Sequence, residues 1–244
     1  MFRPLLVALR LLTRLPVPEP PADGDRARLE ADSLFWFPSV GLLLGGLLWG
    51  GQALLVQAHA PELLQAALLL VAWVVLTGAL HLDGLADTAD AWLGGLGDRE
   101  RTLAIMKDPC AGPAGVVAVV LVLLLKFGAL TAASGLFLLL AVFLGRVVLV
   151  LLFVTTPYVR PGGMGERLAA SGRKALVGVA VTVAPLLLLW PVPTLLALGV
   201  TGVVFSVQRH RLIQRLGGTT GDTAGAMVEW TEAAIIATLV LIGT

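Results

Sequence analysis

Long blocks without charged residues limit what this chain can fold into more than any other feature. Residues 175–208 hold no Asp, Glu, Lys or Arg, and residues 33–80 hold a single one, Glu62. Residues 112–153 hold two, both basic. A helix crosses a lipid bilayer with roughly 17–25 mainly apolar residues, so each block is long enough for two crossings. The mean hydropathy of +0.92 excludes an ordinary soluble domain.

These blocks predict an all-α integral membrane protein with about seven transmembrane helices. The block at 175–208 divides at Trp-Pro-Val-Pro (190–193), because proline interrupts a helix. A further apolar stretch runs from about residue 225 to residue 242. The predicted spans are 37–56, 63–80, 113–131, 136–156, the two halves of 175–208, and 225–242.

Basic residues alternate along the connections between these spans. The segment before the first span and the connections after the second, fourth and sixth contain Lys or Arg, whereas the other connections contain none. Cytoplasmic loops are enriched in Lys and Arg. We therefore expect a cytoplasmic N-terminus, a location in the inner cell membrane, and an active site facing the cytoplasm. A net charge of +1 gives no indication of a nucleic-acid partner.

Residues 1–35 are predicted to form a cytoplasmic segment, and residues 36–244 a single transmembrane catalytic domain. Within 1–15, the arginines and most of the leucines fall on opposite faces of a helix. This pattern predicts an amphipathic helix lying in the membrane interface. The proline-rich, charged stretch 16–32 is predicted to be a linker or cap.

The stretch His-Leu-Asp-Gly-Leu-Ala-Asp-Thr-Ala-Asp-Ala at 81–91 places three acids in a chain that is only 14% charged. Asp83, Asp87 and Asp90 are spaced i, i+4 and i+7, so on a helix they lie within about 60° of one another. Carboxylates on one helix face repel each other. Mg²⁺ offsets such repulsion, because it binds one or two carboxylates together with water and substrate phosphate. We therefore expect a magnesium site; a solvated acidic helix face is the alternative.

Two glycine-rich connections supply candidate phosphate ligands. Lys107 precedes Gly112 and Gly115 at the start of a span, and a lysine beside free backbone N–H groups suits phosphate. A positive charge in a cytoplasmic turn is the alternative. In the last connection, Gly218 lies in a flexible loop before Asp222. Asp222 can cap the following helix, take part in the site, or do both.

Several charged residues fall within the predicted spans, where a charge needs a partner or an aqueous cavity. Glu229 and Glu232 are acidic, and Lys126 and Arg146 are their natural countercharges or, if a cavity reaches them, phosphate contacts. His81 begins the acidic stretch and is either a polar residue of a lid or a base.

Six motifs, in order along nearly the whole chain, resemble cobalamin synthase, the integral membrane adenosylcobinamide-GDP ribazoletransferase family. The most specific is the aspartate run at 81–91. The others are Thr-Arg-Leu-Pro-Val-Pro at 13–18, Phe-Pro-x-x-Gly at 37–41, Ile-Met-Lys-Asp with its glycines at 105–115, Gly-Gly-Met-Gly at 162–165 and Gly-Gly-Thr-Thr-Gly-Asp at 217–222.

This resemblance implies the final assembly of the cobalamin nucleotide loop by a Mg²⁺-dependent phosphotransferase. A hydroxyl of α-ribazole, or of its 5′-phosphate, attacks the corrinoid-linked phosphorus of adenosylcobinamide-GDP, giving adenosylcobalamin (or its 5′-phosphate) and GMP. Mg²⁺ held by Asp83, Asp87 and Asp90 would stabilise the leaving group. Asp222 is the fourth expected catalytic residue, and one aspartate could instead act as the base. The expected substrate and phosphate contacts are Lys107, His81, Gly218, Arg14, Lys126 and Arg146.

A cation- or proton-coupled transporter is the competing interpretation, because intramembrane charges can line an ion pathway. Against it, the densest acids lie at one face of the membrane, and no inverted repeat is visible. Besides its two substrates and the lipid bilayer, candidate partners are a second copy of the chain and other enzymes of corrinoid biosynthesis.

Overall fold

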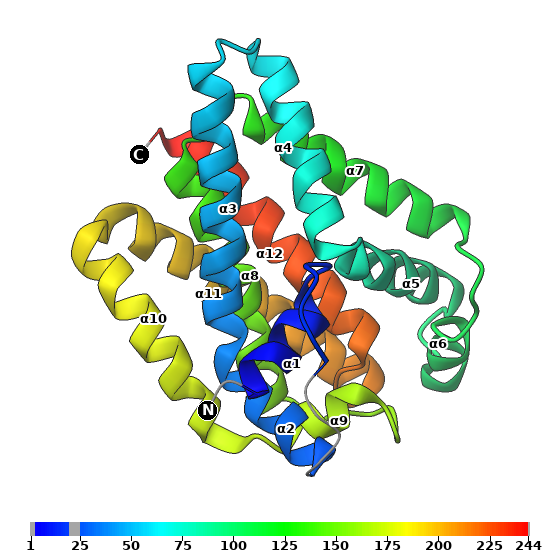
Figure 1. Cartoon of the computed structure of the whole chain (residues 1–244). Helices are drawn as coiled ribbons and strands as arrows, with labels where there is room; N and C mark the ends of the chain where they lie inside the picture. Colours follow the sequence, from blue (N-terminus) through cyan, green and yellow to red (C-terminus); the bar gives the residue numbers. More distant parts are fainter. Residues whose placement is uncertain (1–2, 20–24, 244) are drawn as a thin grey trace.

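The computed structural model describes residues 3–19 and 25–243, and within these ranges the chain is helical, without a strand. Figure 1 shows the helices packed at different tilts around α8. Two short 3₁₀ helices, η1 (Leu34–Trp36) and η2 (Gly172–Lys174), lead into α3 and α10. The α-helices are α1 (Arg3–Leu12), α2 (Arg26–Ser33), α3 (Phe37–Gln57), α4 (Glu62–Thr77), α5 (Leu80–Gly94), α6 (Arg99–Ile105), α7 (Pro113–Leu130), α8 (Gly135–Thr155), α9 (Met164–Ala169), α10 (Ala175–Leu189), α11 (Pro191–Leu216) and α12 (Gly221–Ile242).

Six helical stretches in the described ranges are long and apolar enough to cross a membrane. They are Arg26–Gln57, Pro113–Leu130, Gly135–Thr155, Gly172–Leu189, Pro191–Leu216 and Gly221–Ile242. Helices α4 and α5 form a bent pair that would make a seventh span if counted as one. The prediction of an all-α membrane protein with about seven spans is confirmed. Its orientation and its location in the inner membrane stay predictions.

The N-terminal segment is more helical than its sequence indicates. The stretch 16–32, predicted as a linker or cap, contains α2, which continues through η1 into α3. Asp25 caps α2, and residues 20–24 of the stretch lie outside the described residues. Helix α1 packs against α2 and α3 and buries Ala8 and Leu12, as expected for an amphipathic helix.

Helix α8 forms the core of the bundle and packs against α3, α10, α11 and α12. Nearly all of its side chains are buried, and they are apolar almost throughout. Glycine permits the closest approach of a neighbour: a side chain at Gly45 of α3 would place its Cβ 2.9 Å from the Cα of Leu139. Small residues that bring backbones together are typical of membrane helices, because dispersion contacts there replace the hydrophobic effect.

A bend of 87° separates α4 from α5 and decides where the acidic stretch lies. Gly78 and Ala79 both adopt left-handed backbone conformations, with φ of 63° and 57°, and these end α4. The side chain of Arg14 lies against Gly78. The backbone N–H of Arg14 donates to the carbonyl of Leu76 at 2.8 Å. Helix α5 therefore leaves the direction of α4 and runs across the bundle (Figure 1).

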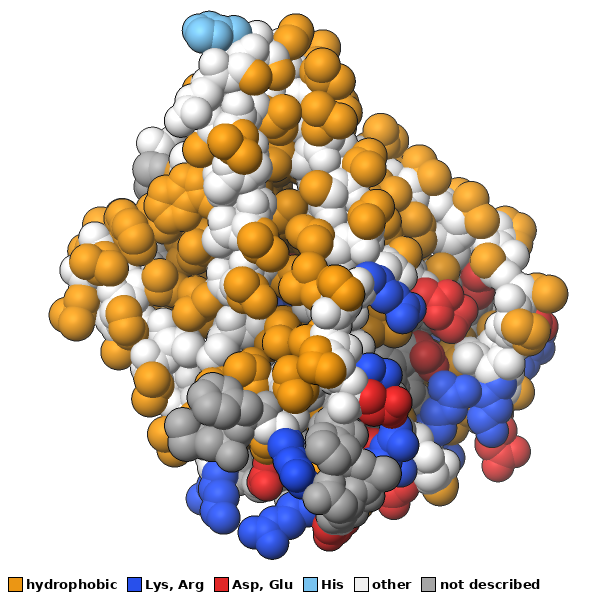
Figure 2. All heavy atoms as spheres, in the orientation of Figure 1, with side chains coloured by type: hydrophobic (Ala, Val, Ile, Leu, Met, Phe, Trp, Pro, Cys, Tyr) orange, Lys and Arg blue, Asp and Glu red, His pale blue; other side chains and the backbone are white. Residues whose placement is uncertain are grey.

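Charged side chains gather at one end of the molecule. Figure 2 shows apolar side chains over the upper part of this face, and Lys, Arg, Asp and Glu side chains over its lower part and lower right. Helices α1, α2, α5 and α6 lie in this lower half in the same view (Figure 1). The division is typical of a membrane protein with a lipid-covered part and a part in contact with water.

Candidate active site

Helices α5 and α12 approach each other so closely that glycine is required between them. A side chain at Gly84 would place its Cβ 2.6 Å from the backbone oxygen of Asp222, and one at Gly225 would lie 3.3 Å from His81. Because the two backbones touch, acids from distant parts of the sequence meet. Asp83 of α5 and Asp222 of α12 line the same cavity.

This cavity, of about 330 Å³, combines charged and apolar groups. Its volume lies at the lower end of the range for small-molecule sites, roughly 300–1,000 Å³. Its polar lining comes from α5, α12 and the loop after α8, and its apolar lining comes mainly from α1, α3 and α8. The polar lining includes His81, Asp83, Tyr158, Arg160 and Asp222, and the apolar lining includes Leu11, Leu12, Phe37, Leu149 and Phe153.

Arg160 pairs with Asp222 inside the cavity: its guanidinium NH1 donates to Oδ2 at 2.9 Å. Two backbone hydrogen bonds fix the loop of Arg160 beside the last connection, from Val159 N–H to the carbonyl of Thr219 at 2.9 Å and from Thr219 N–H to Pro157 at 2.8 Å. Gly218 belongs to this junction, because any side chain there would collide with the Pro157 carbonyl. Gly218 was an expected phosphate contact, but the group that approaches it closely is the backbone of Pro157.

The Gly-Gly-Met-Gly motif at 162–165 packs around Tyr158. Side chains at Gly163 and Gly165 would both collide with the phenol ring. The ring of Tyr158 also contacts Phe153, with 6.4 Å between the ring centroids. The motif therefore shapes one side of the cavity through Tyr158.

Asp222 lies in the first turn of α12 without being its N-cap. Thr220 occupies the N-cap position, and its side chain and that of Thr223 form a reciprocal capping box. The prediction that Asp222 can cap the helix is therefore wrong for this structure, since the cap is already made. Its carboxylate is left to pair with Arg160 at the cavity.

Asp87 lies one turn along α5 from Asp83, beyond the predicted span 63–80. Partial burial, followed by the charges of Asp83, Asp222 and Asp90, raises the pKa of Asp87 from 3.8 to about 6, and the nearby Arg160 opposes this rise. Negative charge therefore accumulates around Asp87 beyond what Arg160 compensates. A cation at this point would lower the energy of the ionised cluster.

Asp90 has different partners from the other two acids of α5. Its Oδ2 accepts the backbone N–H of Gly112 at 2.7 Å, and its Oδ1 accepts that of Gly115 at 2.9 Å. Both N–H groups belong to the start of α7, where backbone donors lack partners within the helix. Asp90 thus joins α5 to the N-terminus of α7, and both carboxylate oxygens are used.

Comparison with known proteins finds matches along nearly the whole chain. A family model described as cobalamin-5-phosphate synthase matches residues 4–240. The chain belongs to this family. It is 55% identical to the adenosylcobinamide-GDP ribazoletransferase of Pseudomonas paraeruginosa, with 97% of each chain covered. It is 53% identical to the proteins of that name in Stutzerimonas stutzeri and Pseudomonas aeruginosa PAO1, with 98% of each chain covered. No solved structure matches the chain.

Some of the remaining candidate residues of this cobalamin-5-phosphate synthase family member also lie at the site. Lys107 lines a small cavity, of about 120 Å³, together with Arg160 and Asp222. His81 is 4% exposed and lines the main cavity beside Asp83. Arg14 instead lies at the bend between α4 and α5.

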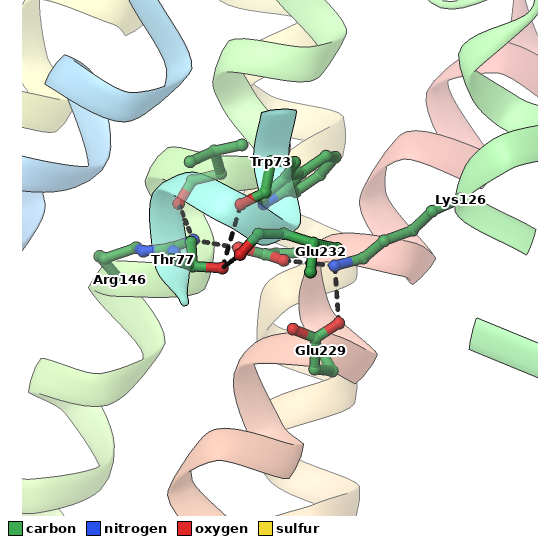
Figure 3. A network of polar contacts seen from close by, with 8 residues as sticks. Trp73, Thr77, Lys126, Arg146, Glu229 and Glu232 are labelled. Atoms are coloured by element: carbon green, nitrogen blue, oxygen red, sulfur yellow. Dashed lines mark hydrogen bonds and ion pairs between the residues drawn. The ribbon is translucent and has the colours of Figure 1, made fainter. Parts of the chain in front are cut away.

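Lys126 and Arg146 form a buried network with the two acids of α12 (Figure 3). Lys126 Nζ lies 2.7 Å from Glu229 Oε2 and 2.5 Å from Glu232 Oε2, and it stacks over the ring of Trp73 at 4.3 Å. Arg146 pairs with the other oxygen of Glu232. These contacts favour the countercharge alternative, and neither basic residue is among the described residues lining the cavity of Asp83 and Asp222.

Within the described ranges, no group of three or more His, Cys, Asp or Glu side chains is arranged to hold a metal ion. A magnesium site does not require such a group, because Mg²⁺ retains waters and takes ligands from substrate phosphate beside one or two carboxylates. Asp83 and Asp87 fit this smaller requirement, since they follow each other by one turn on α5 next to a cavity that Asp83 lines.

Two residues of the site have little signal in the sequence. Arg160 resembles the other basic residues of the connections between the spans, and Tyr158 is the chain's single tyrosine in an otherwise unremarkable stretch. Their position directly before the glycine motif at 162–165 was the available signal. Neither the pairing of Arg160 with Asp222 nor the contact of Tyr158 with the motif follows from spacing.

Proposed function

We propose that the chain transfers the adenosylcobinamide-phosphate group of adenosylcobinamide-GDP to a hydroxyl of α-ribazole or of its 5′-phosphate. The products are adenosylcobalamin, or its 5′-phosphate, and GMP. The observation that carries the proposal is the shared cavity of Asp83, Arg160 and Asp222. Membership in the family and the names of the relatives support the choice of substrates.

In this reaction the ribazole oxygen bonds to the corrinoid-linked phosphorus, and the bond from that phosphorus to the oxygen of GMP breaks. Arg160 offers guanidinium N–H groups to phosphate oxygens, which arginine binds in a two-pronged geometry. Asp222 orients this guanidinium through one oxygen, and its other oxygen can accept the proton of the attacking hydroxyl. Such residues act mainly by positioning and by compensating charge.

We further propose that the reaction depends on Mg²⁺, held by Asp83 and Asp87 at the diphosphate, where the ion would neutralise charge on the leaving phosphate. The raised pKa of Asp87 supports this proposal, because beside partial burial it reflects the negative charges of Asp83, Asp222 and Asp90. Asp90 contributes indirectly by joining α5 to α7. Lys107 adds a positive charge near Arg160 and Asp222.

The inner cell membrane, with the active site toward the cytoplasm, is the proposed location. The alternation of basic connections supports this orientation, since the loops carrying Lys107 and Arg160 are both basic. Both residues line cavities that include Asp222.

The buried charges weigh against a transporter. Lys126 and Arg146 are matched by Glu229 and Glu232, so the network has no net charge when all four are ionised. Intramembrane charges that line an ion pathway usually face a water-filled cavity. These four side chains are instead 0–5% exposed.

The direct test supplies membranes containing the chain with adenosylcobinamide-GDP, α-ribazole and Mg²⁺, and measures adenosylcobalamin and GMP. We expect the two products to appear in equal amounts, and Asp87→Asn membranes to form far less of both. Asp98→Asn is a matched control, since Asp98 caps α6 away from the cavity. Failure of the unmodified chain to form either product would overturn the proposed function.

A further inference from the structure

We propose that the cavity beside Asp83 and Asp222 binds the base of α-ribazole, and that its apolar lining selects the dimethylated benzimidazole. This inference rests on the proposed function and assigns a subsite within it. The apolar group formed by Phe37, Leu149 and Phe153 is called the base wall below.

The base wall is rigidly held and adjoins the charged groups. Its three side chains are 2%, 4% and 6% exposed, respectively, so the packed core of the bundle fixes their positions. Phe153 contacts the ring of Tyr158, which lies two residues before Arg160. A ligand lying on the base wall is therefore within the same cavity as Arg160 and Asp222.

α-Ribazole has the chemistry that such a lining recognises. Its base is a flat, apolar bicycle with two methyl groups, and its ribose carries the hydroxyl that reacts. Apolar and aromatic side chains bind such a base, while a few polar groups fix the orientation of the ligand. The volume of about 330 Å³ suits a nucleoside but excludes the corrin macrocycle with its adenosyl ligand.

Guanine fits the base wall poorly, because its polar edge would face apolar side chains and lose hydrogen bonds made in water. The guanosine and corrinoid parts of the other substrate must therefore lie outside the base wall. This leaves the cavity free for the acceptor, with the reacting hydroxyl directed at Asp222 and the phosphates at Arg160.

A second, larger cavity provides an internal comparison. It has a volume of about 610 Å³ and is lined by groups of α5, α7, α11 and α12, among them Trp92, Val117 and Trp230. It is also apolar and aromatic, but no aspartate is among its described lining residues. A ribazole bound there would keep its hydroxyl away from Asp83 and Asp222, so we assign the base to the smaller cavity.

The first test narrows the cavity. Leu149→Phe adds volume at the base wall, and we expect it to raise the KM for α-ribazole about tenfold or more while the KM for adenosylcobinamide-GDP changes less than about twofold. Val117→Phe makes a comparable insertion in the larger cavity and should leave both KM values unchanged. The amount of protein in the membrane and its thermal stability in detergent are measured for each variant.

The second test widens the cavity and measures the specificity for the base of the acceptor. Phe153→Leu removes aromatic surface, so the preference in kcat/KM for α-ribazole over the riboside of unmethylated benzimidazole should fall several-fold. A merely structural role of Phe153 would lower both values equally and leave the ratio unchanged.

Direct binding separates this inference from the proposed function. Equilibrium dialysis of α-ribazole alone with the purified chain needs no turnover, and Leu149→Phe should weaken the binding about tenfold, whereas Val117→Phe should not. If the unmodified chain binds ribazole but forms no product, the proposed function fails and the subsite stands. Equal binding by Leu149→Phe and the unmodified chain, or weakening by Val117→Phe instead, would overturn the subsite.

Discussion

Asp90 and Gly112 are joined by a hydrogen bond of 2.7 Å between Oδ2 and the backbone N–H, and Gly115 donates to the other oxygen at 2.9 Å. Asp90, which belongs to the aspartate run at 81–91, therefore accepts hydrogen bonds from the backbone N–H groups at the start of α7, the next span. The three aspartates of α5 divide into two that are free to meet a substrate and one that is bound to the chain.

Asp90→Asn should affect stability more than metal use. The amide can accept one of the two N–H groups but opposes the other with its own NH₂, so we expect a loss of about 1–2 kcal/mol and a lower melting temperature. The Mg²⁺ concentration for half-maximal rate should stay close to that of the unmodified chain, whereas Asp87→Asn should raise it. An equal rise in both variants would make Asp90 a metal ligand.

The raised pKa of Asp87 predicts how Mg²⁺ acts at different pH. Between about pH 4 and 6 the folded chain holds a proton on Asp87 that the unfolded chain has lost, because the pKa rises from 3.8 to about 6 on folding. In the absence of metal, protonation of Asp87 adds to the free energy of unfolding, and this contribution is lost as the pH rises through about 6. Mg²⁺ should then raise the melting temperature more at pH 7.5 than at pH 5. A pH-independent shift would contradict metal binding at Asp87.

The buried ion-pair network is formed by Lys126, Arg146, Glu229 and Glu232. Removing one basic and one acidic residue together should cost less stability than removing a single residue. Lys126→Met leaves two carboxylates opposite one guanidinium, and we expect a loss of about 3–5 kcal/mol. The double variant Lys126→Met, Glu229→Leu retains a matched Arg146 and Glu232, so its melting temperature should recover in part. A double variant that is less stable than Lys126→Met would show that the network does not act through charge balance.

Hydropathy predicts most of this fold, because a bilayer requires long apolar helices whose backbone groups are satisfied internally. It does not predict the bend after α4, since the left-handed conformation of Ala79 is unfavourable for the residue alone and depends on tertiary contacts. The acidic stretch directly follows the predicted span 63–80, as the sequence indicates, but the bend turns it across the bundle.

The candidate site was predictable in its acids but less so in their partners. Helical spacing places Asp83 and Asp87 together because it depends only on neighbouring residues. Spacing cannot specify that Asp90 meets Gly112, or that Asp222 meets Arg160, since these contacts depend on how distant helices pack. Charge balance did indicate the pairing of Lys126 with the acids of α12, because an unpaired charge inside a membrane is costly.

The predicted orientation can be tested with single cysteines in a chain whose Cys110 is replaced by serine. Pro61→Cys lies at the exposed start of α4, and Ser171→Cys lies in a basic connection. Ser171 is preferable to Gly163, where a side chain would collide with Tyr158. A membrane-impermeant thiol reagent added to intact cells should label position 61 and not position 171. Equal labelling, or the reverse, would contradict a cytoplasmic N-terminus.

Asp87 and Asp222 should behave as one catalytic unit. The two lie close enough to interact, since the charge of Asp222 contributes to the raised pKa of Asp87. We expect Asp87→Asn and Asp222→Asn each to lower kcat roughly 100-fold or more, because an amide can neither take a proton nor balance a cation. Groups that act together are strongly non-additive, so the double variant should lose little more than either single variant.

The control and the readout for this pair follow from the capping of α12. Because Thr220 and Thr223 already cap the helix, Asp222→Asn should leave the melting temperature nearly unchanged, and a purely structural loss is thereby separated from a catalytic one. Ser134→Ala, which removes the N-cap of α8 away from the site, is the matched variant; it should lower the melting temperature and spare the Mg²⁺ requirement. If the losses of the two aspartate variants multiply in the double variant, or if Asp222→Asn keeps normal turnover and Mg²⁺ dependence, Asp222 is not part of the site, and the acids of α5 act without it.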